Sequence, residues 1–385
     1  MTRLAWPRPL MEQVHDDLRQ TARTFFEKEV QPHNQTWAKA GIVPRDTWLK
    51  AGKTGLLCVD VPEAYGGPGI DDFRFNVVVA EEQGRVGASG PGFSVHSDII
   101  VPYLTSLGTE EQKRRWLPGC VTGEIITAIA MTEPGAGSDL QGVRTTAVDK
   151  GDHYLLNGSK TFISNGINAD LVIVVARTDP DAGHRGISLL VVERGMTGFE
   201  RGRNLEKVGL HAQDTAELSF TDVMVPKENL LGPEGSGFIS LMKNLPQERL
   251  IIAVQAAAAC EFIVEMCLDY ASTREAFGKP IGKFQHNRFV LAEMATEARV
   301  ARSFIDDCVR RHLDRELDSA GAAMAKWWAT ELQNKLVNQG VQLHGGYGFM
   351  LEYPIAQAYL DSRISTIYGG TTEIQKEIIG RSLGL

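Results

Sequence analysis

The sequence predicts an α+β protein with an N-terminal helical domain, a central β-sandwich or barrel, and a C-terminal four-helix bundle. Three observations favour this fold class. Helical apolar spacing dominates the first third of the chain, and short β-branched segments between turn signals fill the middle. Long helical stretches with short connections fill the remainder, as in a bundle. The expected domain limits are 1–125, 126–233 and 234–385.

The first domain is expected to be nearly all helical. Val14, Leu18, Ala22 and Phe25 fall near one face of a helix. Thr109 begins a capping box, in which the hydroxyl and a glutamine three residues later satisfy the first free N–H groups of a helix. The helices expected in this domain are 11–30, 47–57, 73–86, 97–107 and 109–121.

The central domain begins with an apolar β-like run at 126–131 and ends in an exit loop at 230–237. Residues 157–158 are interpreted as a hairpin turn. Clusters of Asp, Gly and Pro at 149–152 and 179–183 predict further turns. The other expected strands are 143–148, 154–157, 160–164, 171–177, 187–193 and 216–225.

The last domain is predicted from its long helical stretches. Pro246 suits the first turn of a helix, where a missing N–H costs nothing. The helices expected are 247–271, 284–312, 318–344, 355–363 and 371–383.

The bulk composition excludes several classes of function. The 385 residues are 43% hydrophobic and 23% charged, which is ordinary for a folded globular chain. A net charge of -8 argues against a nucleic-acid-binding surface. The nine histidines have no metal-binding spacing and the five cysteines form no C-x-x-C pair, so we expect reduced cysteines and no metal.

We expect a cytoplasmic protein with no membrane span. The N-terminal sequence MTRLAWPRPL lacks a long apolar signal core, and the most apolar helical run, 250–260, is too short to cross a bilayer. A mitochondrial matrix protein shown without its transit peptide would look the same.

The stretch 126–139, ITAIAMTEPGAGSD, is a candidate platform for a flat, phosphate-bearing cofactor. A strand leads into a loop where Gly135 and Gly137 let backbone N–H groups approach a ligand. Thr132 and Ser138 add hydroxyls that can donate or accept. A strand followed by a simple tight turn explains the same residues, so the stretch alone does not decide between the two.

Four later sequence motifs favour the cofactor-binding interpretation over a simple turn. They are NGSKTFISNG at 157–166, REAFG at 274–278, QLHGG at 342–346 and YGGT at 368–371. With 126–139 they occur in the order found in the acyl-CoA dehydrogenase family, and the chain resembles that family over nearly its whole length. Within the family it looks most like the long-chain acyl-CoA dehydrogenases.

The resemblance implies FAD-dependent α,β-dehydrogenation of an acyl-CoA thioester, with electrons passed to an electron-transfer flavoprotein. It also implies a homotetramer built as a dimer of dimers, with FAD shared between subunits. Several family cofactor contacts match residues of the first two runs, namely Ala130, Met131, Thr132, Gly137, Ser138, Phe162, Ile163 and Ser164. Other contacts, some of them to a neighbouring subunit's cofactor, match Arg274, Phe277, Gln285, Gln342, Leu343, Gly345, Gly346, Thr371 and Glu373.

The departure from the family pattern concerns the catalytic base. Many members carry a glutamate where this chain has Gly369, which cannot take a proton. Long-chain and isovaleryl enzymes place the glutamate on a helix instead, and the matching residue is Glu248. By resemblance the N–H of Gly369 grips the thioester oxygen, and the substrate contacts are Ser138, Pro246, Gln247, Arg249, Gly369 and Gly370.

Glu248 is expected near the positive end of a helix dipole, with burial acting against it to raise its pKa. Read without the resemblance, Glu248 and Arg249 are solvated charges of a first helical turn.

The acyl chain and the acceptor are left open. Ala253 and the alanines at 256–259 are consistent with a deep channel or with close helix packing. Ile239 stands where long-chain relatives have tyrosine. The alternatives on the same fold are a flavin oxidase or monooxygenase, a branched-chain dehydrogenase of the isovaleryl type, and a non-catalytic member.

Overall fold

The first helices form where apolar side chains recur on one face, and Ala22 and Phe25 of α1 are buried. The computed structural model describes residues 7–385, so part of the N-terminal sequence used above lies outside the described residues. Thr109 and Gln112 form the predicted capping box. The elements of this domain are α1 (Gln13–Phe25), η1 (Phe26–Val30), η2 (Gln31–His33), α2 (Asn34–Ala40), α3 (Arg45–Lys53), η3 (Glu63–Tyr65), α4 (Phe73–Arg85), η4 (Val95–Ile100), α5 (Val101–Leu107) and α6 (Glu110–Thr122).

The central strands form one hydrogen-bonded path in the order β6-β7-β3-β2-β4-β5-β8, with β1 parallel to β4. Side chains of β1 to β5 and β7 meet in one apolar core, so the sheet curls over a shared interior. The strands are β1 (Thr127–Ala130), β2 (Thr146–Asp149), β3 (His153–Ser164), β4 (Leu171–Arg177), β5 (Ile187–Glu193), β6 (Phe199–Asn204), β7 (Thr215–Pro226) and β8 (Leu230–Leu231).

Strand β4 fixes the sheet against the N-terminal helices. Val172 and Val174 face the interior of the sheet, whereas Ile173 and Val175 belong to the core shared with the N-terminal helices. A strand buried on both faces has a continuous run of apolar residues in its sequence. This is why the sequence predicts a strand at 171–177.

Two expectations for the central domain are wrong. The hairpin at 157–158 does not form, because β3 continues past it with a register shift between Leu156 and Gly158. Gly158 has φ +152°, and a Cβ there would collide with Thr145, so glycine permits the bulge. β6 was missed because most of its side chains are charged or polar and none is fully buried.

The bundle is built on α7 (Gly237–Thr273), which begins ten residues before the predicted start. Pro246 lies inside this helix, not in its first turn. Glu248 is therefore remote from the helix N-terminus, and the expected help from the helix dipole is wrong, since that effect is confined to the first turn. The other elements are β9 (Glu275–Ala276), β10 (Lys279–Pro280), η8 (Ile281–Lys283), α8 (Gln285–Leu313), α9 (Ser319–His344), η9 (Gly345–Phe349), α10 (Pro354–Ser362), η10 (Arg363–Thr366) and α11 (Thr372–Ser382).

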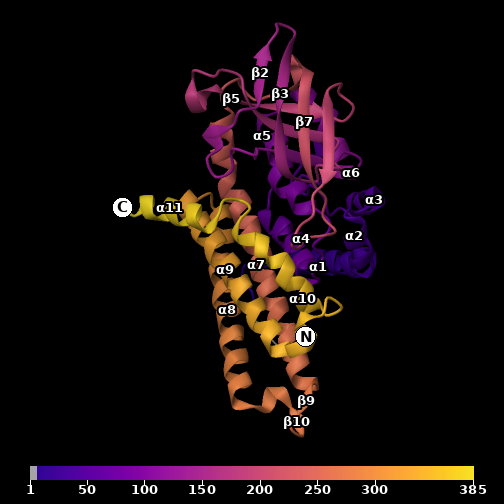
Figure 1. Cartoon of the computed structure of the whole chain (residues 1–385), viewed down its shortest axis with the longest axis vertical. Coiled ribbons are helices and arrows are strands. Elements are labelled where there is room, and N and C mark those ends of the chain that lie inside the picture. The colour runs from indigo at the N-terminus through magenta and orange to yellow at the C-terminus, as the bar shows by residue number, and fades with distance from the viewer. Residues whose placement is uncertain (1–6) are drawn as a thin grey trace.

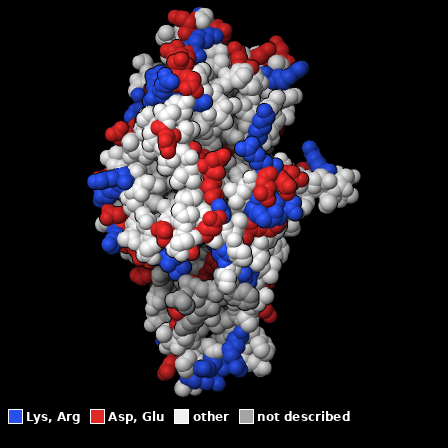
Figure 2. All heavy atoms as spheres, turned by 180° about the vertical axis from the view of Figure 1, so that it is seen from behind, with Lys and Arg blue, Asp and Glu red and all other residues white. Residues whose placement is uncertain are grey.

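The predicted order of helical, β and helical domains is confirmed. Figure 1 shows the β-domain at one end of the molecule and the β9–β10 hairpin at the other, joined along α7. The domain limits stay a prediction. On the reverse face, positive and negative side chains are interspersed (Figure 2).

Helix α7 is long and apolar enough to cross a membrane by length and composition, so the expectation from run 250–260 was wrong about length. However, 67% of its most apolar window is buried inside the chain. Ala253, Ala256 and Ala257 share a core with Val77 and Ala80 of α4. Core packing therefore accounts for the apolar face of α7, and these alanines serve close helix packing.

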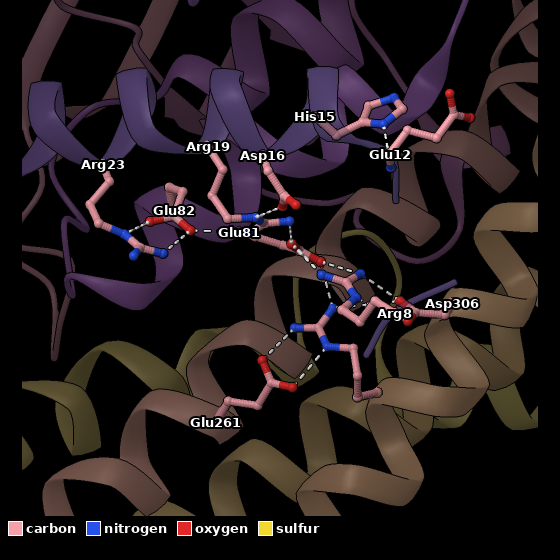
Figure 3. Close-up of polar contacts among 11 residues, drawn as sticks. Arg8, Glu12, His15, Asp16, Arg19, Arg23, Glu81, Glu82, Glu261 and Asp306 are labelled. Carbon is pink, nitrogen blue, oxygen red and sulfur yellow. Dashed lines mark hydrogen bonds and ion pairs between the residues drawn. The ribbon is translucent and has the colours of Figure 1, made fainter. Parts of the chain in front are cut away.

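A buried ion-pair network ties the N-terminal helices to the bundle (Figure 3). Glu81 of α4 accepts hydrogen bonds from Arg302 of α8 at 2.6 Å and from Arg8 at 2.8 Å. Arg302 also donates to Glu261 of α7 at 2.9 Å. Burial alone would raise the pKa of Glu81, but the arginines hold it far below its ordinary value.

Replacing Arg302 with methionine should destabilise the protein by about 3 kcal/mol, because it leaves the buried Glu81 with fewer counter-charges. Arg310→Met is the matched control, since Arg310 is exposed and pairs with Asp307 of α8 and with Asp314, the residue directly after that helix. It should cost less than about 1 kcal/mol. Urea unfolding of the two variants measures the difference, and equal losses would contradict the network's role.

Candidate active site

Two segments far apart in sequence are joined at the end of β1. The N–H of Thr161 in β3 donates to the carbonyl of Thr132 at 2.9 Å. Lys160 donates from Nζ to the carbonyl of Met131 at 3.0 Å and to Glu133 at 2.8 Å. The structure thus brings together the two predicted cofactor-binding runs.

Lys160 and Glu133 stabilise this junction, and neither was predicted from the sequence. Burial lowers the pKa of Lys160 to about 8, although Glu133 acts in the opposite direction. Burial alone would raise the pKa of Glu133, but hydrogen bonds from Lys160 and from the N–H groups of Arg144 and Thr145 hold it below its ordinary value.

Phe162 presents its ring to solvent from a strained backbone. Its φ is +61°, which a bulky residue rarely adopts, and the residue is 68% exposed. The bulge between Lys160 and Ile163 produces this orientation, since Ile163 next to it is only 3% exposed. Strain of this kind persists at binding sites, where the surrounding fold imposes it. The exposed ring is a platform for a flat ligand.

The remaining predicted cofactor residues fall into separate groups. Ala130 is buried at the end of β1, and Gly137 and Ser138 lie exposed in the loop after it. Thr371 caps the start of α11, and Glu373 follows in its first turn.

A further group lies at the far end of α7. The guanidinium of Arg274 lies 5.6 Å from the ring centre of Tyr347, next to Gly345 and Gly346. Phe277 is 95% exposed on the β9–β10 hairpin. Gln285 opens α8, and Gln342 and Leu343 close α9. Figure 1 places this group at the end of the molecule opposite the β-domain, so a single chain does not bring it to Phe162.

Glu248 is enclosed in the interior beside α5. It is 5% exposed, and its Oε1 accepts a hydrogen bond of 2.6 Å from the hydroxyl of Tyr103. Burial raises the pKa of Glu248 to about 7, and the Tyr103 hydrogen bond and the charge of Arg249 oppose that rise. A carboxyl group poised near neutrality is able to exchange a proton with a bound ligand.

The loop at 368–371 is held against α7 with two glycines in left-handed conformations. Gly369 has φ +66° and Gly370 has φ +92°. Lys326 of α9, which is fully buried, donates to the carbonyl of Gly370 at 2.8 Å. Gln375 of α11 donates to the carbonyls of both glycines at 3.1 and 2.9 Å. Neither Lys326 nor Gln375 was predicted.

The helix and the loop meet at Ile252. A Cβ built on Gly369 would lie 2.5 Å from Cδ1 of Ile252, closer than real side chains approach. Glu248 and Ile252 are four residues apart on α7 and therefore share one face of the helix. The carboxylate of Glu248 thus lies on the face of α7 that the loop approaches.

A surface hollow of about 540 Å³ opens beside the first turns of α7. Its apolar wall includes Phe238, Ile239, Met242 and Pro246 of α7. Gln247 points elsewhere, donating to the carbonyl of Asp98 at 3.0 Å. Arg249 is buried with an unpaired Nε, and burial lowers its pKa.

Comparison with known proteins matches this chain along its length. Models of the acyl-CoA dehydrogenase N-terminal, middle and C-terminal domains match residues 12–124, 128–223 and 235–384. The chain belongs to the acyl-CoA dehydrogenase family. The resemblance seen in the sequence is confirmed, and the protein is a flavin-dependent oxidoreductase of that family.

Three relatives illustrate the similarity of this acyl-CoA dehydrogenase to known proteins. The mitochondrial long-chain specific acyl-CoA dehydrogenase of Mus musculus is 52% identical over 378 residues, 98% of this chain and 88% of the relative. The caffeyl-CoA reductase-Etf complex subunit CarC of Acetobacterium woodii is 37% identical, covering 95% of this chain and 97% of the relative. The crystal structure of an acyl-CoA dehydrogenase from Geobacillus kaustophilus, 53% identical, has a TM-score of 0.97 and covers 98% of this chain and 100% of that chain.

The residues at the end of β1 fit a flavin in this acyl-CoA dehydrogenase. Phe162 offers an exposed aromatic face, and no neighbouring atom lies within 4 Å of a Cβ built on Gly137, so the loop beside it is open. Residues 130–132 and 161–164 would flank the ring, and Arg274 carries a guanidinium suited to phosphate oxygens.

Gly369→Ala should lower turnover, because the new methyl group would displace Cδ1 of Ile252 and disturb the packing of the loop on α7. The positive φ itself should cost about 1 kcal/mol. Gly55→Ala is the matched control, with φ +75° and nothing within 4 Å of the new Cβ. Thermal unfolding should show a comparable strain cost in the two variants, and steady-state assays should show lost activity only in Gly369→Ala. Full activity of Gly369→Ala would contradict the clearance argument.

Proposed function

We propose that this acyl-CoA dehydrogenase uses FAD to oxidise long-chain acyl-CoA thioesters to trans-2-enoyl-CoA, with Glu248 as the base and electron-transfer flavoprotein as the acceptor. The observation that carries the proposal is a buried Glu248 on the face of α7 approached by a loop that has no side chain of its own at Gly369.

Glu248 has the properties that the base requires. The α C–H of a thioester is a weak acid, so proton removal needs a carboxylate whose proton affinity is raised toward neutrality. Burial gives Glu248 a pKa of about 7. Asp98 also has its pKa raised to about 7 by burial, but its oxygens are engaged by Asn76 and Ser94. That engagement favours Glu248 over Asp98 as the group that meets a substrate.

The loop at 368–371 supports the second requirement, which is polarisation of the thioester carbonyl. A backbone N–H held in a water-poor site stabilises negative charge that develops on an oxygen. Lys326 and Gln375 bind the carbonyls of Gly369 and Gly370 and so hold the two peptide units that follow the N–H of Gly369. The flavin, when bound, supplies the hydride acceptor. Met131, Thr132 and Phe162 would orient its ring.

Long-chain specificity is proposed from two lines of support. One is the printed name of the mouse relative, which is 52% identical. The other is the hollow of about 540 Å³ beside Pro246, which is of the size of a ligand pocket and has an apolar wall. The name of the Acetobacterium woodii relative, which mentions an Etf complex, supports an electron-transfer flavoprotein as partner.

Glu248→Gln should keep the flavin and lower turnover by at least about 10²-fold, because general base catalysis contributes that much. Asp98→Asn is the control, because Asp98 is a second buried carboxyl group whose pKa is raised to about 7. Its turnover should stay within a few-fold of the unaltered enzyme. Steady-state assays at saturating acyl-CoA measure both variants, and near-full activity of Glu248→Gln would refute the base assignment.

Anaerobic addition of saturated acyl-CoAs of increasing length should bleach the flavin absorption band most completely with long chains. Preferential bleaching by short or branched chains would reject the long-chain proposal but keep the reaction class. Rapid reoxidation of the bleached enzyme by air would favour the oxidase alternative, since a dehydrogenase passes its electrons to a protein acceptor.

A further inference from the structure

We propose that Tyr103 is a positioning residue for the reaction, holding one carboxylate oxygen of Glu248 so that the other faces the substrate. The inference deepens the proposed function and rests on Glu248 being the base. It concerns a residue on a different domain from the base, which no sequence motif singled out.

The geometry is that of a dedicated contact. The hydroxyl of Tyr103 donates to Oε1 of Glu248 at 2.6 Å, and Tyr103 is 0% exposed. Among residues 7–385 this is the one hydrogen bond made by the Glu248 carboxylate. One oxygen is therefore held while the other is available to a proton.

The two segments that carry these residues are tied at a second point. Gln247, next to Glu248, donates from Nε2 to the carbonyl of Asp98 at 3.0 Å. Asp98 lies in the π-helical turn η4, which leads directly into α5 and Tyr103. The phenol ring is packed in the core shared by the N-terminal helices, so the hydroxyl has little freedom to leave. Two adjacent residues of α7 are thus fixed against η4 and α5 of the N-terminal domain.

The hydrogen bond favours the ionised form of Glu248, because a phenol donates to a carboxylate more strongly than to a carboxylic acid. Burial and the negative charge of Glu248 raise the pKa of Tyr103 far above its ordinary value, so the phenol stays a donor. Losing the hydroxyl should raise the pKa of Glu248 from about 7 and let its side chain turn.

Other charged groups near Glu248 remain in place when the hydroxyl is removed. Arg249 on the same helix continues to favour the carboxylate. Lys326 of α9 is bound to Gly370, Asp98 of η4 to Asn76, and Glu81 of α4 to its arginines. A change in the titration of Glu248 would therefore report on Tyr103.

The test is the pH dependence of kcat/KM in the FAD-loaded enzyme carrying Tyr103→Phe. The base must be ionised, so activity falls below its pKa, near pH 7 in the unaltered enzyme. In Tyr103→Phe the acid limb should move up by about one pH unit. Tyr154→Phe is the control, because Tyr154 is equally buried and donates to Glu234, in the loop between β8 and α7, at 2.8 Å. The acid limb of the kcat/KM profile should stay at the same pH in Tyr154→Phe.

If Tyr103→Phe folds poorly, a second variant tests the same inference. Replacing Tyr103 by 3-fluorotyrosine makes a stronger donor of nearly the same shape and should move the limb to lower pH. An unchanged limb in both Tyr103 variants, with Glu248→Gln inactive, overturns the inference and keeps the base. Full activity of Glu248→Gln instead removes the proposed function on which the inference rests.

Discussion

The close approach of the 368–371 loop to α7 is the constraint on which the site depends. A Cβ built on Gly369 would lie 2.5 Å from Cδ1 of Ile252, so the loop packs directly on α7 at this point. Gly369 contributes only main-chain groups, and on the proposed assignment the carboxylate comes from the helix. Glu248 lies one helical turn from the contact, and its depth inside the chain brings its pKa to about 7.

Other parts of the fold fix that approach from outside. Lys326 and Gln375 bind the loop from α9 and α11, and Tyr103 and Gln247 fix α7 against the N-terminal helices. The Arg302 network joins the same two domains on another part of α7. Each of these contacts is polar and at least partly buried, so the fold loses stability when one partner is removed.

The sequence predicted the order of domains because strong local patterns coincide with burial. The run 171–177 is apolar throughout since both faces of β4 are covered, and the Thr109 capping box marks a helix start without tertiary help. β6 was missed because its strand is polar, and Pro246 was taken as a helix start because a proline inside a helix depends on tertiary support. Lys160, Lys326 and Tyr103 could not be found, since a buried polar residue looks like a surface residue until the fold supplies its partner.

The candidate cofactor residues lie in two groups separated along α7, whose 37 residues make a helix of roughly 55 Å. If FAD is shared between subunits, as the family resemblance implies, one chain contributes half of each of two sites and completes neither. Two chains with damage in different halves, one at Phe162 and one at Arg274, would then form one undamaged site when they assemble together. The inheritance of such defects would follow from this geometry, because two alleles that are each inactive alone would restore part of the activity in combination.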